Sequence, residues 1–125
     1  MVDRNIKIPT PEHPITIERN PRRVIVALNR KTIADTTAAL TLREAQYAAV
    51  QYIPRQDVDM MALARSATKT YCPYKGEASY YSVTAGDVTV EDVIWTYEKP
   101  YPAVAAIAGH VAFYPNMADI SVAPD

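Results

Sequence analysis

A tyrosine-rich segment with a proline–glycine turn at its centre constrains the fold of this chain most strongly. Residues 73–76 have the sequence PYKG. Pro73 suits the second position of a type I turn because its ring fixes φ, and Gly76 supplies the positive φ that closes a bulged hairpin. The segment therefore predicts two paired strands, residues 69–72 and 77–83, joined by this turn.

The rest of the chain indicates one small, mainly β domain. Its 125 residues fit a single domain with a real core. Prolines are frequent and β-branched and aromatic residues abound, which favours an antiparallel β fold over a helical one. We expect a proline-punctuated lead-in over residues 1–14 and a single β-rich domain over residues 15–125. Further strands are predicted at residues 15–17, 22–28, 32–35, 48–53, 93–97, 110–114 and 120–122.

Two segments carry helical signals. Residues 56–66 have a possible cap at Asp57 and an apolar face, and they predict the one short helix of the fold. Residues 37–47 are ambiguous, because Thr41 and Glu44 have capping-box spacing while Leu40 and Leu42 alternate as in a strand. We favour a strand followed by a loop for this second segment.

Charge and cysteine content exclude several classes of function. Thirteen basic and fourteen acidic residues give a net charge of −1, which argues against nucleic acid as a partner. No apolar stretch reaches the length of a membrane span, and no secretion signal is evident, so we expect a cytoplasmic protein and no membrane partner. The single cysteine excludes an internal disulfide and a cysteine-built zinc site. We expect neither a metal nor a cofactor.

The turn itself brings together a thiol, an ammonium and a carboxylate. Cys72 is a candidate nucleophile if Lys75 lowers its pKa and the fold brings His110 near as a base; otherwise it is a small, partly buried thiol. Lys75 and Glu77 can hold a small polar ligand or form a solvated ion pair.

Three other groups have both a structural and a functional interpretation. A role as a helix cap is sufficient to explain Asp57, which is also a candidate general base. Five aromatic side chains are most simply explained as core, and they also suit an apolar ligand cavity: Tyr52, Tyr80, Trp95, Tyr97 and Phe113. His13 is expected to be exposed in the lead-in, and His110 to be a satisfied core histidine.

The order of motifs resembles domain-of-unknown-function family 427. The matching segments are residues 52–58 (YIPRQDV), residues 70–80 (TYCPYKGEASY), and Trp95 and Tyr97 followed by Pro100, Gly109, Phe113 and Tyr114. The resemblance runs from about Ile15 to Val122 and implies a small antiparallel fold similar to the β-tent, or Mss4-like, group. Many members of that group hold zinc with four cysteines, which this chain lacks. The family carries a nucleotidyltransferase-like name, whereas the chain has neither a phosphate loop nor paired metal-binding carboxylates.

Taken together, these patterns predict a domain that binds a small polar molecule beside the hairpin at residues 72–76. The expected ligand-binding residues are Tyr52, Asp57, Thr70, Cys72, Lys75, Glu77, Tyr80, Trp95 and Tyr97. One alternative is an enzyme acting on a small polar substrate through Cys72 or Asp57. Another is a structural interaction module that forms a homodimer through an edge strand.

Overall fold

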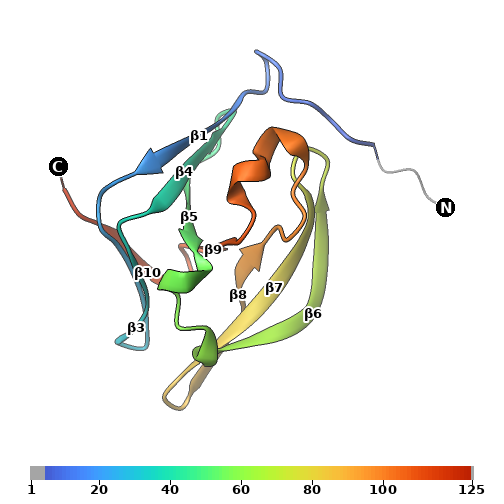
Figure 1. The fold of residues 1–125 in the computed structure, drawn as a ribbon. Helices are drawn as coiled ribbons and strands as arrows, with labels where there is room; N and C mark the ends of the chain where they lie inside the picture. The colour runs from blue at the N-terminus through green and yellow to red at the C-terminus, as the bar shows by residue number, and fades with distance from the viewer. Residues whose placement is uncertain (1–4, 125) are drawn as a thin grey trace.

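The computed structural model describes residues 5–124, and strands dominate them (Figure 1). All strand pairs are antiparallel. The strands are β1 (Ile15–Asn20), β2 (Val24–Leu28), β3 (Lys31–Thr36), β4 (Ala39–Glu44), β5 (Val50–Pro54), β6 (Leu63–Cys72), β7 (Gly76–Ala85), β8 (Val88–Thr96), β9 (His110–Phe113) and β10 (Asp119–Val122). Short 3₁₀ helices are η1 (Arg55–Asp57), η2 (Met60–Ala62) and η3 (Pro102–Ile107). The predicted mainly antiparallel β fold is confirmed.

A seven-stranded sheet in the order β1-β4-β5-β9-β8-β7-β6 forms the body of the molecule. Figure 1 shows this sheet bent, so that β1, β4 and β5 form one wing, β6, β7 and β8 form the other, and β9 connects them. The orange segment η3 lies between the two wings. A three-stranded sheet in the order β10-β2-β3 completes the fold.

Side chains pack into two separate cores because β7 presents large residues on both of its faces. Tyr81 and Val83 pack with β2 and β3 residues such as Val24 and Ile33 in the first core. Tyr80 points to the other face and packs in the second core, inside the bend of the large sheet. That second core is formed by Leu42, Tyr52, Ala78, Tyr80, Tyr97, Val104, Ile107 and Ala112. The bend thus encloses a tyrosine-rich interior.

The central hairpin forms where the sequence predicts it, and both of its strands are longer than expected. Cys72 pairs with Gly76 across the turn, and the Lys75 N–H donates to the Cys72 carbonyl at 3.2 Å. Gly76 has φ +110°, a value that residues with a Cβ rarely adopt, so glycine is needed here. The local turn signal was therefore sufficient to predict this element.

The predicted helix over residues 56–66 is wrong. The chain forms only the single turns η1 and η2 and then enters β6 at Leu63, which pairs with Val83. Asp57 makes no capping hydrogen bond, and Met61, which was expected on the apolar face, is 97% exposed. The hydrogen bonds and packing that β6 gains by pairing with β7 stabilise the strand more than a short, isolated helix would stabilise this segment.

The lead-in is attached to the domain rather than detached from it. The Lys7 N–H donates to the Pro73 carbonyl at 3.0 Å, and Thr10 forms an isolated bridge with His13. None of the helices between residues 5 and 124 has the length and apolarity that crossing a membrane requires.

Candidate functional site

A pocket of about 170 Å³, partly open to solvent, lies inside the bend of the large sheet. Strands β4 and β5 form one wall, and β7 and β8 form the other. The turn of the central hairpin contributes Lys75. The lining residues are Leu42, Glu44, Tyr47, Ala48, Val50, Tyr52, Lys75, Tyr80, Trp95, Tyr97 and Tyr114. The pocket is thus rich in aromatic rings, with one anion and one cation among them.

Trp95 is held in place by two tyrosines. Its ring centroid lies 4.5 Å from that of Tyr114, and Tyr52 meets it edge-on at 6.3 Å. The indole N–H donates to the Tyr52 hydroxyl at 3.1 Å. These contacts fix the indole plane as a wall of the pocket, and such aromatic packing contributes energy beyond the area it buries.

The hydroxyls on one side of the pocket are hydrogen-bonded to one another. The Tyr80 hydroxyl lies 2.9 Å from Thr70 Oγ1 and 3.3 Å from the Tyr114 hydroxyl. Burial, followed by the interaction with Tyr80, raises the pKa of Tyr114 to about 12. The Tyr114 hydroxyl therefore stays protonated at neutral pH, and the bonds among these hydroxyls hold the rings in fixed positions.

Tyr97 differs from these tyrosines because no described residue forms a hydrogen bond with its hydroxyl. The side chain is well packed, with Tyr97 only 8% exposed. No unpaired side-chain oxygen in the described part of the chain is sealed from solvent, so the Tyr97 hydroxyl keeps some exposure, and Tyr97 is one of the residues that line the pocket. Tyr52 also has a proton to donate, because its oxygen accepts from Trp95. Burial raises the pKa of both tyrosines well above the ordinary value, which keeps both O–H groups as donors.

An ion pair lies at the wall of the pocket where β4 ends. Lys75 Nζ donates to Glu44 Oε1, and His13 Nε2 lies 2.7 Å from Glu44 Oε2. Only 10% of the Lys75 side chain and 13% of the Glu44 side chain are exposed. The His13 ring stacks on Tyr74 with centroids 4.1 Å apart. Residues from the lead-in, β4 and the hairpin turn are thus joined through one carboxylate.

Burial alone would raise the pKa of Glu44, but the hydrogen bonds from Lys75 and His13 outweigh it and hold the pKa below the ordinary value of 4.5. An acid whose folded pKa is depressed stabilises the fold above its unfolded pKa, and that stabilisation is lost as the pH falls through the folded value. We therefore expect the stability gap between the wild type and Glu44→Gln to narrow as the pH is lowered from about 7 to about 3. Urea unfolding at several pH values measures this gap.

The matched control is Glu91→Gln, whose side chain lies exposed on β8. Its gap from the wild type should stay nearly constant over the same pH range. A Glu44→Gln gap that is equally constant would show that the Lys75 and His13 contacts do not stabilise the ionised carboxylate.

The structure brings five of the predicted ligand-binding residues to this pocket: Tyr52, Lys75, Tyr80, Trp95 and Tyr97. Thr70 lies behind Tyr80 and bonds its hydroxyl. Cys72 packs against the second core, and its Sγ lies 3.7 Å from Lys75 Nζ.

Asp57 lies elsewhere in the fold. It accepts a hydrogen bond from Thr36 Oγ1 at 2.7 Å, beside the small sheet. His110, the base considered for Cys72, donates from Nδ1 to the Ala108 carbonyl at 2.9 Å and is not among the lining residues. The two candidate catalytic residues therefore occupy different parts of the molecule.

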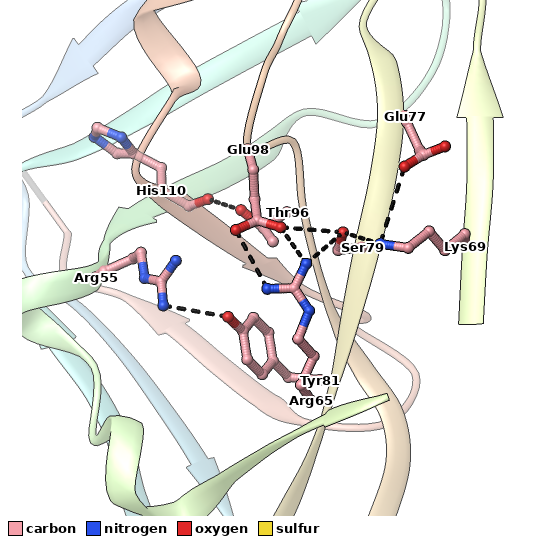
Figure 2. A network of polar contacts seen from close by, with 9 residues as sticks. All are labelled: Arg55, Arg65, Lys69, Glu77, Ser79, Tyr81, Thr96, Glu98 and His110. Carbon is pink, nitrogen blue, oxygen red and sulfur yellow. Dashed lines mark hydrogen bonds and ion pairs between the residues drawn. The ribbon is translucent and has the colours of Figure 1, made fainter. Parts of the chain in front are cut away.

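Glu77 belongs to an exposed polar network over β6 and β7 (Figure 2). It lies 3.9 Å from Lys69 Nζ, which donates to Ser79 Oγ at 3.0 Å. Arg65 donates to the same Ser79 oxygen at 3.2 Å and forms an ion pair with Glu98. These side chains bond one another on the opposite face of β7 from Tyr80, away from the pocket.

Sequence reasoning missed six lining residues: Leu42, Glu44, Tyr47, Ala48, Val50 and Tyr114. It also placed His13 in solvent, whereas His13 is half-buried and bonded to Glu44. The capping-box spacing of Thr41 and Glu44 indicates a helix end, and it contains no signal that Glu44 forms an ion pair. Among residues 5–124, no three histidine, cysteine, aspartate or glutamate side chains cluster closely enough to hold a metal ion.

Comparison with known proteins agrees with the resemblance noted in the sequence. A family model named NTP_transf_9 and described as a domain of unknown function, DUF427, matches residues 16–124. The comparison with curated proteins gives no match. The lead-in, including His13, lies outside the matched region.

Proposed function

Since this chain belongs to the DUF427 family, whose description names no reaction, we propose its function from the pocket: it binds a compact planar molecule between Trp95 and the tyrosines of the bend. The observation that carries this proposal is Tyr97, which lines the pocket and is only 8% exposed, and whose hydroxyl has no hydrogen-bond partner among the described residues.

Pocket size limits the ligand to about one ring. An engineered apolar cavity of about 150 Å³ is known to accommodate benzene, and the pocket here measures about 170 Å³. Flat aromatic walls favour a flat ligand, because offset or edge-on ring contacts are favourable. Trp95, fixed by Tyr52 and Tyr114, provides such a wall without having to reorganise.

Polar groups in the pocket define which atoms the ligand should carry. A hydrogen bond contributes about 0.5–1.5 kcal/mol net, so a ligand atom that accepts from a hydroxyl of the pocket adds to affinity. Tyr97 and Tyr52 each have an O–H to donate, and Lys75 adds an ammonium. Apolar walls with a few oriented polar groups are typical of small-molecule sites. We therefore expect a ring that carries a carbonyl or carboxyl oxygen.

Benzamide is a suitable probe because it combines a planar ring with a carbonyl acceptor. Trp95 is the only tryptophan of the chain, so its fluorescence reports directly on this pocket. We expect a saturable change in Trp95 fluorescence as benzamide is added. The absence of any saturable change up to the solubility limit of benzamide would contradict the proposed function.

Tyr97→Phe tests the hydroxyl itself. This variant should weaken benzamide binding about fivefold, because one hydrogen bond to the ligand is lost. Its free energy of unfolding without ligand should equal or exceed that of the wild type, since Tyr97 gives up no bond within the described chain.

Tyr80→Phe is the matched control for stability. It removes a hydroxyl that contacts both Thr70 and Tyr114 and should cost about 1 kcal/mol of stability. If Tyr97→Phe were as destabilising as Tyr80→Phe, or bound benzamide as well as the wild type, the Tyr97 hydroxyl would not be a ligand contact.

A further inference from the structure

The charged groups at the pocket leave no carboxylate oxygen without a partner. Both oxygens of Glu44 are engaged, one by Lys75 and the other by His13. Lining groups that keep a hydrogen to donate include the Lys75 ammonium and the hydroxyls of Tyr52 and Tyr97. These donors suit a ligand that accepts hydrogen bonds, whereas both oxygens of the one lining carboxylate are already bonded.

The net charge of the cluster formed by Lys75, Glu44 and His13 depends on whether His13 is protonated. Because Nε2 lies 2.7 Å from an ionised carboxylate oxygen, it carries a proton, and neutral His13 takes up its second proton at Nδ1. About a quarter of the side chain is exposed, so protons reach the ring from solvent. With neutral His13, the charges of Glu44 and Lys75 cancel; with protonated His13, the cluster carries one net positive charge.

The other groups around His13 are few. Its ring stacks on Tyr74, its backbone bonds Thr10, and Glu12 and Tyr47 line the hollow beside it. The charged groups around the ring are therefore Glu12, Glu44 and, on the far side of Glu44, Lys75.

We propose that the ligand is a planar carboxylate, and that its binding is coupled to uptake of a proton by His13. This inference depends on the proposed function. The ligand carboxylate accepts from Lys75 and a tyrosine hydroxyl, and it adds one negative charge beside Glu44. A proton on His13 Nδ1 restores the balance, with two positive and two negative groups in the partly buried cluster. No covalent bond forms or breaks except the N–H bond to that proton.

Proton linkage makes the effect reciprocal. If the anion favours protonated His13, then protonated His13 favours the anion by the same factor. Affinity for the carboxylate should therefore rise as the pH falls and His13 takes up its second proton. Affinity for a neutral ring of the same shape should change little as the pH falls.

Three nearly isosteric probes test the charge preference: benzoate, benzamide and benzamidine carry negative, zero and positive charge. At about pH 6 we expect benzoate to bind about tenfold more tightly than benzamide, and benzamidine to bind most weakly. Isothermal titration calorimetry in two buffers with different ionisation enthalpies measures proton uptake. Benzoate should take up a fraction of a proton per molecule near about pH 6.5, and benzamide none.

His13→Gln tests the role of the imidazole, since the glutamine amide nitrogen can take the place of Nε2 and donate to Glu44 but does not titrate. In this variant, proton uptake should disappear and the ratio of benzoate to benzamide affinity should become independent of pH between about 6 and 8.

The outcomes separate this inference from the proposed function. If benzamide binds and benzoate binds no more tightly, or if His13→Gln retains proton uptake, the carboxylate inference is overturned and the binding function stands. If none of the three rings binds, both are overturned.

Discussion

Lys75→Met should lower the free energy of unfolding by about 3 kcal/mol, because removing one partner of a buried ion pair leaves the other charge uncompensated. Glu44 would then keep His13 as its one side-chain partner among the described residues, with 13% of the Glu44 side chain exposed. For a domain of this size we expect the melting temperature to fall by about 10 °C. Chemical denaturation at neutral pH measures the difference in free energy.

Lys69→Met is a matched control on the same hairpin. Lys69 pairs with Glu77 at 3.9 Å, but about half of each side chain is exposed. Such pairs contribute at most about 1 kcal/mol, so this variant should remain close to the wild type. The double variant Lys75→Met with Glu44→Leu should recover most of the lost stability, since an apolar pair replaces a buried ion pair at little cost. Equal losses in Lys75→Met and Lys69→Met would contradict the buried ion pair.

Ala48→Phe should weaken the binding of benzamide at least about tenfold while changing stability by no more than about 0.5 kcal/mol. Ala48 lies exposed in the loop between β4 and β5, and its methyl group lines the pocket. A phenyl group at this position occupies the space that the ligand ring needs. The titration of Trp95 fluorescence measures the loss of binding.

Ala49→Phe controls for the added bulk. Ala49 is the neighbouring exposed residue, and it lines a different hollow with Phe113 and Ile120. This variant should bind benzamide as the wild type does. If Ala48→Phe also bound benzamide normally, the ring would not occupy the pocket described above.

The sequence allowed the central hairpin to be predicted because its signal is local. Proline and glycine at fixed positions of a four-residue turn dictate backbone angles, and Gly76 indeed has φ +110°. The aromatic wall could be predicted for a similar reason, because Tyr80 and Trp95 lie in strands, and Tyr97 directly after one, whose alternation is visible in the sequence.

The role of Glu44 could not be predicted in this way. Its partners Lys75 and His13 are each 31 positions away along the chain, and no spacing rule connects them. The contact arises because β1 pairs with β4 and brings the end of the lead-in beside Glu44, while the bend of the sheet brings the hairpin turn to the same place. Only the assembled topology shows that these three residues meet.

The helix predicted at residues 56–66 failed for the same kind of reason. Val58 and Leu63 do point inward, but they do so from an irregular segment and the start of β6. The apolar spacing was real, whereas the backbone conformation was set by pairing with β7, which lies farther along the chain.

Intermolecular nuclear Overhauser effects between benzamide and the isotope-labelled protein test the central claim most directly. The ring protons of benzamide should give contacts to Trp95, Tyr97 and Leu42, which line the pocket together. Contacts to Ile6 and Ile8 beside Tyr101, or to Phe113 and Ile120, would place the ring in one of the other hollows. Either of those results would contradict a binding site inside the bend of the sheet.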